Sequence, residues 1–476
     1  MEPAYLKTRQ KRASAYPLFA TRMPLGLNRY LSGRLIPFEH PSKSAVPLTM
    51  KTASPNRILA ALLLTILCAG CAQSSMPGSG RFVITQFGAV DDGKTMNTQA
   101  IQRTIDKAAE SGGGTVVVPK GTYLSGAVFL KKGVNLLVEK DGVLKGSEDV
   151  KDYPEMMTRI EGHFQNWLPA LVNADSIDHL RIGGEGTLDG SGPVYWKAFD
   201  TARAADRAVK NLDVPRPRLM FIRDSKDVQV TGLRFKDSGF WNLHIYRCDG
   251  VIVDGLDIRA DEPSPSTDGT DIDSCRNVTI RNCYYAVSDD CIALKGTKGP
   301  LAMDDKDSPP VEHIRVDNCT FERGNGFITC GSEATIVRDV VLTNCRAVGP
   351  RSYGIAALRL KMRTDTPQLY EDMHFSDITL EGDGSVITIA PWSQYFDLQG
   401  HPQPTRHVNN ISVKNVKGSF GSLGSLRGGP GDVIENITLE NIDITAQRAP
   451  TPLTGVKNLI IKNVKVNGVE VTAPAE

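Results

Sequence analysis

A phrase that recurs through the second half of the chain begins as KDVQVTG at residues 226–232 and DGVIVDG at residues 249–255. In most copies a polar residue is followed by apolar residues at alternate positions and then by Asn or Asp. The later copies are RNVTIRNC (276–283), EHIRVDNC (312–319), RDVVLTNC (338–345), the weaker EDMHFSDI (371–378), NNISVKNV (409–416), ENITLENI (435–442) and KNLIIKNV (457–464). Alternation is the period of a β-strand, and the first apolar residue recurs every 22 to 38 residues, a spacing typical of coils with loops. The repeat therefore predicts an all-β fold, a single-stranded parallel β-helix whose coils bury each other's inward side chains.

The residues that follow each strand repeat as well. Asn tolerates left-handed backbone and can hydrogen-bond its copy in the next coil, so we expect ladders of Asn along the solenoid. Seven cysteines follow residue 71, an odd number with no CxxC pair, which argues against a disulfide framework or a metal cluster. We interpret them as buried thiols at equivalent places in the coils.

A solenoid end presents apolar side chains and unpaired strands, so it needs a cover. The segment TQAIQRTIDKAAES (98–111) predicts a short capping helix at the N-terminal end, because its apolar residues form one stripe. The stripe consists of Ile101, Ile105, Ala108 and Ala109, with Asn97 or Thr98 as the N-cap and Gly112–Gly114 at the end. One β-helix domain is expected over residues 81–476.

Composition and charge limit the class of protein. With 40% hydrophobic and 23% charged residues among 476, the chain is globular, neither disordered nor a multi-span membrane protein. Residues 1–70 carry ten Lys and Arg against two acidic residues, so the remainder is acidic, with 45 basic against 52 acidic residues. An acidic folded part argues against nucleic-acid binding, which needs a basic face.

The N-terminal region predicts export. The apolar run ILAALLLTIL (58–67) follows Lys51 and Arg57 and is too short to span a bilayer as a helix, but it suits a signal peptide. Cys71 follows small residues, as in a lipoprotein processing site, with simple signal cleavage as the alternative. We interpret residues 1–49 as a mis-assigned or disordered extension, 50–71 as the signal peptide and 72–80 as a linker. The expected location is the periplasm or cell surface of a bacterium.

Two acidic phrases stand in consecutive coils: STDGTDID at 266–273 and VSDDCIALK at 287–295. If the chain bends before the strand CIALK, and Gly269 allows a matching bend, Asp268, Asp289 and Asp290 form one cluster. Such a cluster suits glycoside hydrolysis, in which one acid protonates the leaving oxygen and another carboxylate activates water. Calcium binding is the alternative, although the phrase does not match an EF-hand loop. We predict no metal and no other cofactor.

Downstream residues suggest what the acids act on. In LRLK (358–361), Arg359 and Lys361 alternate on a strand and face the same way, which suits an anionic sugar. Aromatic rings provide stacking platforms for sugars, and the candidates are Trp241, Trp392 and Tyr395. His244 is expected at the edge of the substrate or in a structural role.

The order of these phrases resembles glycoside hydrolase family 28, the polygalacturonase family, over residues 82 to about 445. Further phrases that resemble the family are FGAVDDGKTMNTQAIQRTIDKA (87–108), GGGTVVVPKGTY (112–123), GEGTLDGSG (184–192), FWNLHIYRC (240–248) and GSE at 331–333, whose Glu333 is expected to bind the substrate. The resemblance implies a right-handed, pectin-lyase-like β-helix. It implies that Asp289 is the general acid, that Asp268 and Asp290 activate water with inversion, and that Arg359 and Lys361 hold a galacturonate carboxylate.

One departure from the family pattern concerns the acid. The family has Gly-His-Gly shortly before Gly-Ser-Glu, whereas this chain has Asn325 between two glycines. Asn can donate a hydrogen bond to the acid or the sugar, but it does not titrate near neutral pH. Ser266 also replaces an Asn of the family.

The expected activity is an inverting, polygalacturonase-like hydrolysis of galacturonic-acid-containing pectic polysaccharide, leaning towards exo action, by a monomer. A rhamnogalacturonan hydrolase is the alternative among hydrolases. A polysaccharide lyase is less favoured, because elimination commonly uses calcium with a basic residue. A β-helix that binds carbohydrate without turnover is the alternative from another class.

Overall fold

The structure, a computed structural model, describes residues 80–349, 355–448 and 453–473. The expected extension, signal peptide and lipidation site at Cys71 lie outside the described residues. All described residues fall in one compact unit, Ser74–Glu476. Within it, the helices that are described do not include one of the length and apolarity needed to cross a membrane.

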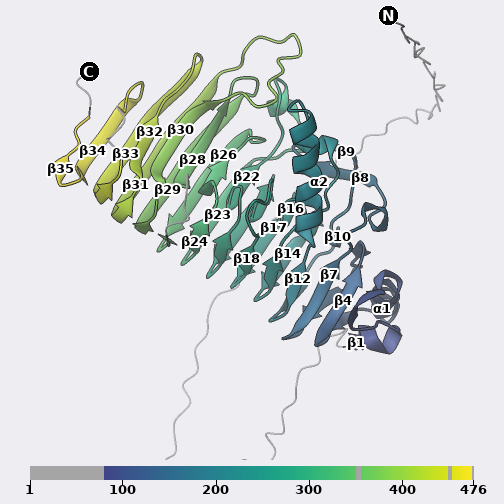
Figure 1. The fold of residues 1–476 in the computed structure, drawn as a ribbon. Helices are drawn as coiled ribbons and strands as arrows, with labels where there is room; N and C mark the ends of the chain where they lie inside the picture. Colours follow the sequence, from purple (N-terminus) through teal and green to yellow (C-terminus); the bar gives the residue numbers. More distant parts are fainter. Residues whose placement is uncertain (1–79, 350–354, 449–452, 474–476) are drawn as a thin grey trace, which may run out of the picture. The chain divides into compact units, whose positions relative to one another are not determined.

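The described chain winds into a parallel β-helix with three rows of strands (Figure 1). The first row contains β1 (Arg81–Val83), β3 (Gly114–Val118), β6 (Val134–Val138), β11 (Arg181–Gly184), β14 (Lys226–Thr231), β17 (Asp249–Asp254), β20 (Arg276–Arg281), β23 (Val311–Asp317), β26 (Ile336–Thr343), β29 (Gln368–Glu381), β31 (Arg406–Phe420), β33 (Asp432–Ala446) and β34 (Lys457–Val466). The second contains β2 (Asp92–Met96), β4 (Gly121–Ser125), β7 (Gly142–Gly146), β12 (Thr187–Asp189), β15 (Arg234–Lys236), β18 (Asp257–Arg259), β21 (Tyr284–Ala286), β24 (Thr320–Arg323) and β27 (Arg346–Ala347). The long strands β29, β31 and β33 continue from the first row into the second, so both rows count as one sheet.

The third row is a separate sheet of ten strands, and it carries the site described below. Its strands are β5 (Val128–Phe129), β10 (Val172–Asp175), β13 (Met220–Arg223), β16 (Leu243–Tyr246), β19 (Thr270–Asp273), β22 (Ile292–Lys295), β25 (Gly326–Cys330), β28 (Ala356–Arg363), β30 (Ser385–Trp392) and β32 (Ser422–Leu426). An antiparallel hairpin, β8 (Met156–Ile160) and β9 (His163–Trp167), and the short β35 (Val469–Glu470) lie outside the three rows. Single 3-10 turns are η1 (Ile84–Phe87), η2 (Val150–Asp152), η3 (Asn211–Asp213) and η4 (Ala302–Asp304).

The sequence repeat coincides with the first row. Its nine copies form β14, β17, β20, β23, β26, β29, β31, β33 and β34. Their first apolar residues pair in register, as in Val228 with Val251 and Val251 with Val278, and the weak copy aligns Met373 between Val340 and Ile411. The predicted right-handed parallel β-helix is therefore confirmed.

Polar ladders run beside this row, as predicted. Asn318 donates from Nδ2 to Asn282 Oδ1 at 2.7 Å, and Asn463 donates to Asn441 at 3.0 Å. Both Asn282 and Asn318 have positive φ, at 57° and 51°, the left-handed region that Asn tolerates best after Gly. The backbone of each Asn thus forms a turn of its own coil, and its side-chain amide bonds to the next coil.

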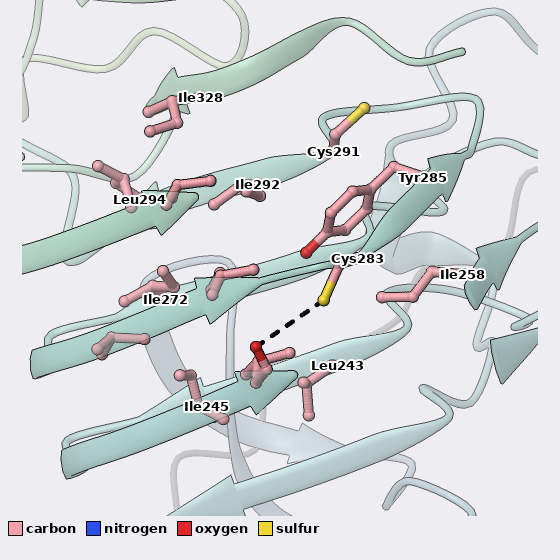
Figure 2. Packing of buried hydrophobic residues seen from close by; sticks show 14 of the residues in the cluster. Leu243, Ile245, Ile258, Ile272, Cys283, Tyr285, Cys291, Ile292, Leu294 and Ile328 are labelled. Atoms are coloured by element: carbon pink, nitrogen blue, oxygen red, sulfur yellow. Dashed lines mark hydrogen bonds between the residues drawn. The ribbon is translucent and has the colours of Figure 1, made fainter. Parts of the chain in front are cut away.

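The interior of the coil is filled by apolar side chains from all three rows. Figure 2 shows Ile245, Ile272 and Leu294, which occupy matching positions on β16, β19 and β22. Cys283 and Cys291 belong to the same buried cluster. All seven cysteines that follow residue 71 are free and buried, so the interpretation as core thiols is confirmed.

Helix α1 (Thr98–Glu110) covers the N-terminal end of the coil beside β1 (Figure 1). Ile101, Ile105 and Ala108 are buried as predicted, while Ala109 is only partly buried. Asn97 is the N-cap, but its side chain does not cap the helix. It holds the preceding loop instead, accepting from Val90 N–H at 2.7 Å and donating to the Val90 carbonyl.

Two further elements pack outside the third row and wall the site. Helix α2 (Gly192–Ala205) is anchored by Trp196, whose indole N–H donates to the Ser238 carbonyl at 2.9 Å. The β8–β9 hairpin is anchored by Arg159, which pairs with Asp273 at 3.1 Å with both side chains buried. The outward face of this sheet binds these covers through aromatic contacts as well as polar ones, since Phe164 of β9 packs against Tyr246 of β16 with the ring centres 5.7 Å apart.

Candidate active site

Three acidic side chains meet at the start of two neighbouring strands. Asp268 precedes β19, and Asp289 and Asp290 precede β22, whose first residues pair in register with those of β19. The chain bends at Asp289, and Gly269 N–H donates to the Asp290 carbonyl at 2.9 Å. One oxygen from each acid lies within 4.8 Å of the others. The predicted cluster is therefore formed, and it opens to a cavity rather than to the interior of the coil.

Asp290 is held as a carboxylate. Lys361 Nζ lies 2.7 Å from Oδ2, Thr329 Oγ1 donates to Oδ1 at 2.8 Å, and Arg359 lies 3.9 Å away. Burial alone would raise the pKa of Asp290, but the Lys361 ammonium and the Arg359 guanidinium outweigh it, and the pKa lies below its ordinary value. The residue is therefore ionised at neutral pH.

Asp289 has the opposite environment. Its burial and the negative charge of Asp290 raise its pKa above the ordinary value. Asn325 Nδ2 donates to Asp289 Oδ1 at 3.0 Å, which confirms that Asn in place of the family His can donate to the acid. Two adjacent carboxyls with pKa values pushed apart are what acid–base catalysis needs.

Lys295 links Asp268 to a deeper set of acids. Its Nζ lies 3.2 Å from Asp268, 3.4 Å from Asp271 and 3.5 Å from Glu333. Burial raises the pKa of Asp268 well above its ordinary value against the pull of Lys295, and burial raises that of Asp271 to about 7. The sequence pattern did not single out this lysine, although its alternation with Ala293 on CIALK places it on the outward face with the acids.

The acids line a cavity of about 390 Å³, a size in the range of small-ligand sites. All but one of the predicted catalytic and binding side chains line it: Asp268, Asp289, Asp290, Asn325, Glu333, Arg359, Lys361, Trp241, Trp392 and Tyr395. Arg359 and Lys361 lie over the Trp392 ring, at 5.5 and 5.1 Å from its centroid. Glu333 is engaged by Lys298 at 3.2 Å, and neighbouring cations hold its pKa below the ordinary value against burial.

His244 is the exception, and of its two expected roles the structure supports the structural one. The ring is fully buried and does not line the cavity. Arg218 donates to its Nδ1 at 2.7 Å, so the proton is on Nε2, which faces Asp273 at 3.4 Å. Burial lowers its pKa to about 4, and the neutral ring joins the support beneath the site.

Elements from outside the third row complete the walls, and sequence analysis did not identify them. Phe199 and Arg203 of α2, Asn211 of η3 and Glu161 at the tip of the hairpin line the cavity. Asn211 N–H donates to the Tyr395 hydroxyl at 3.3 Å. The segments after α2 and after β30 therefore meet at the cavity, and only a fold that brings them together reveals the contact.

The segment that carries Tyr395 is held from below. Arg363 donates to the Gln394 carbonyl at 2.8 Å and to the Tyr395 carbonyl at 3.3 Å. Asp365 binds the same guanidinium at 2.8 and 2.6 Å and accepts from Asp397 N–H at 2.9 Å. The wall is thus tied to the end of β28, the strand that presents Arg359 and Lys361.

Comparisons with known proteins point to one family. The family model "Glycosyl hydrolases family 28" matches residues 113–471. A "Probable polygalacturonase" of Vitis vinifera is 25% identical over 397 residues, covering 79% of this chain and 77% of that protein. An "Exopolygalacturonase" of Zea mays is 27% identical over 358 residues, covering 73% of this chain and 76% of that protein.

Two solved structures share the fold. A hyperthermoactive exopolygalacturonase from Thermotoga maritima has a TM-score of 0.71 at 24% identity, covering 83% of this chain and 93% of that chain. A polygalacturonase from Erwinia carotovora has a TM-score of 0.62 at 23% identity, covering 82% of this chain and 97% of that chain. With the family model matching most of its length, this chain belongs to glycosyl hydrolases family 28.

Proposed function

We propose that the protein hydrolyses α-glycosidic bonds of galacturonic-acid-containing pectic polysaccharide from a chain end. The observation that carries the proposal is the pair Asp289 and Asp290, whose pKa values are shifted in opposite directions beside two cations in one cavity. Relatives named polygalacturonase and exopolygalacturonase support the substrate class.

In this proposal Asp289 donates its proton to the leaving glycosidic oxygen. Asp290, with Asp268 beside it, accepts a proton from the attacking water. Arg359 and Lys361 bind the uronate carboxylate, and Trp392, which lies against both cations, provides a stacking face for the sugar ring. Asn325 holds Asp289 in place but does not exchange a proton.

We propose inversion at the anomeric carbon. The nearest oxygens of the three acids lie within 4.8 Å, closer than the 6.5 to 9.5 Å or so between carboxyls in most inverting enzymes. Both oxygens of Asp290 are, however, already engaged by Lys361 and Thr329, which favours a role in orienting water over attack on the sugar. NMR of the first product formed from an α-linked substrate tests this, and an initial α-anomer would refute inversion.

Exo action is supported by the wall around Tyr395. The Asn211–Tyr395 hydrogen bond and the Lys210 ammonium 5.6 Å from the Tyr395 ring join two segments that line the cavity. Contact between these two segments narrows the groove and so limits the passage of a long polymer. A free groove, in contrast, is what cleavage within a chain requires.

Product analysis on homogalacturonan and rhamnogalacturonan, side by side, tests the function. We expect saturated galacturonate from homogalacturonan from the first minutes with little loss of viscosity, and no turnover by Asp289→Asn. Products from rhamnogalacturonan alone would favour the alternative hydrolase, unsaturated products would indicate a lyase, and binding without release of reducing ends would indicate a carbohydrate-binding protein. Any of these three outcomes overturns the proposal.

The place of action is proposed from the sequence. The apolar run at 58–67 and Cys71 support export with a lipid anchor in a bacterium. Loss of membrane association on Cys71→Ser, with the enzyme still exported, is the expected result.

A further inference from the structure

The α2 wall of the cavity carries Arg203, whose surroundings differ from those of the other cations that line the cavity. Phe199 and Arg203 lie one helical turn apart on the same face of α2, and both line the cavity. Arg203 is exposed, and its guanidinium lies 5.7 Å from the centre of the Phe199 ring. Among the described residues, it has no carboxylate within ion-pair distance.

The other cations that line the cavity are paired within the described part of the chain. Lys295 pairs with Asp268, Arg363 with Asp365, and Lys361 with Asp290, at 3.2 Å or less in each case. Arg359 is 3.9 Å from Asp290. Among the described residues, Arg203 is therefore the cation of the cavity lining that lacks an ion-pair partner.

A second guanidinium, that of Arg216, packs against Phe199. Arg216 is fully buried, with its guanidinium 4.1 Å from the Phe199 ring. It donates to the Pro265 carbonyl at 2.7 Å and to Ser266 Oγ at 3.2 Å, and its Nε has no partner among the described residues.

All the hydrogen-bond partners of Arg216 are neutral. Burial lowers its pKa to about 10, so the group is still charged at neutral pH. A buried guanidinium without an ion-pair partner is unfavourable. Glu161, Asp200 and Asp289 favour its charged form without forming an ion pair with it, and an anion bound in the cavity near Phe199 would add to their effect.

We propose that Arg203, with Phe199 and Arg216 behind it, binds the carboxylate of a second uronate residue, next to the one held by Arg359 and Lys361. The inference rests on the proposed function and specifies its substrate. A cavity with cations on both the strand floor and the α2 wall selects two successive acidic sugars. It favours this pair over a uronate that is followed by a neutral sugar, because the exposed Arg203 gains an ion-pair partner only from the second carboxylate.

Binding to the Asp289→Asn protein tests this without turnover. The two probes are digalacturonate, with two carboxylates, and a galacturonate–rhamnose disaccharide, with one. The test variant is Arg203→Gln. The matched control is Lys197→Gln, which removes a cation from the outer face of the same helix, away from the cavity.

We expect Arg203→Gln to weaken digalacturonate binding about tenfold, as for loss of a hydrogen bond to a charged group, and to change disaccharide binding with one carboxylate less than about twofold. Lys197→Gln should change neither, and added salt should reduce the Arg203 effect. Equal loss for both probes, or no loss for digalacturonate, would overturn the inference. A different result would overturn the proposed function instead: Arg203→Gln weakens the binding of digalacturonate alone, but the wild-type protein releases no reducing ends from homogalacturonan.

Discussion

Replacing Lys361 with Met would test whether the charge of Asp290 depends on one buried partner. The Lys361 ammonium lies 2.7 Å from Asp290 Oδ2, and the two residues are 7% and 1% exposed. Met fills similar space without charge. Asp290 would keep the Thr329 hydrogen bond and the more distant Arg359.

The attraction between unit charges at this distance is about 6 kcal/mol at an effective dielectric constant of about 20. Desolvation offsets part of it, and removing one partner of a buried pair typically costs about 3 to 5 kcal/mol. Because Arg359 remains, we expect a loss in the free energy of unfolding of about 3 kcal/mol at pH 7, at the lower end of that range.

The stability difference between wild type and Lys361→Met should depend on pH. Since the folded-state pKa of Asp290 lies below its ordinary value, the stability that this pairing contributes is present above the unfolded-state pKa and is lost as pH falls through the folded-state pKa. The difference between wild type and Lys361→Met should therefore shrink below about pH 4. In the variant the acid limb of kcat/KM should move to higher pH.

Urea denaturation at several pH values measures the stability difference. Asp290→Asn combined with Lys361→Met should recover most of the lost stability, because both charges are then gone. The control is Lys414→Met at the surface pair of Lys414 and Glu440, 3.1 Å apart, which should change the free energy of unfolding far less than Lys361→Met does. A pH-independent loss with no recovery in the double variant would show that Lys361 contributes packing rather than charge.

Two other positions give direct tests. Asn325→His should move the basic limb of the pH–rate profile to lower pH, because a charged imidazole beside Asp289 lowers the pKa of the acid, whereas Asn325→Ala removes a donor to the carboxylate and should move that limb to higher pH; unchanged profiles in both would contradict the role of Asp289 as the acid. Asn318→Gly should lower the free energy of unfolding by about 1 kcal/mol through the lost ladder bond to Asn282. Asn318→Ala should lower it by about 2 kcal/mol or more, since Ala also pays for the positive φ of 51°; equal losses in denaturation experiments would show that backbone conformation is not what selects Asn.

The sequence predicted those site residues that lie at equivalent positions of stacked repeats. Asp268, Asp289 and Asp290 follow from two phrases in consecutive coils, and the alternation of Arg359 with Lys361 places both on one face. The sequence left two roles open for His244, because alternation does not reveal that Arg218 and the hairpin cover this part of the sheet. Arg203 could not be found, since a basic residue on a surface helix ordinarily faces solvent.

The fold of this protein follows from local sequence patterns. Alternation and coil length determine which side chains point inward, and the same pattern recurs in each coil. The chemistry of the site depends instead on which charges become neighbours. Asp290 and Lys361 are 71 positions apart in the chain, and α2 reaches the cavity only through its anchors on other coils. Electrostatic pairing at a few ångströms is set by three-dimensional distance. The tertiary structure alone therefore decided which carboxyl has a lowered pKa, which has a raised pKa and which cation in the cavity has no ion-pair partner among the described residues.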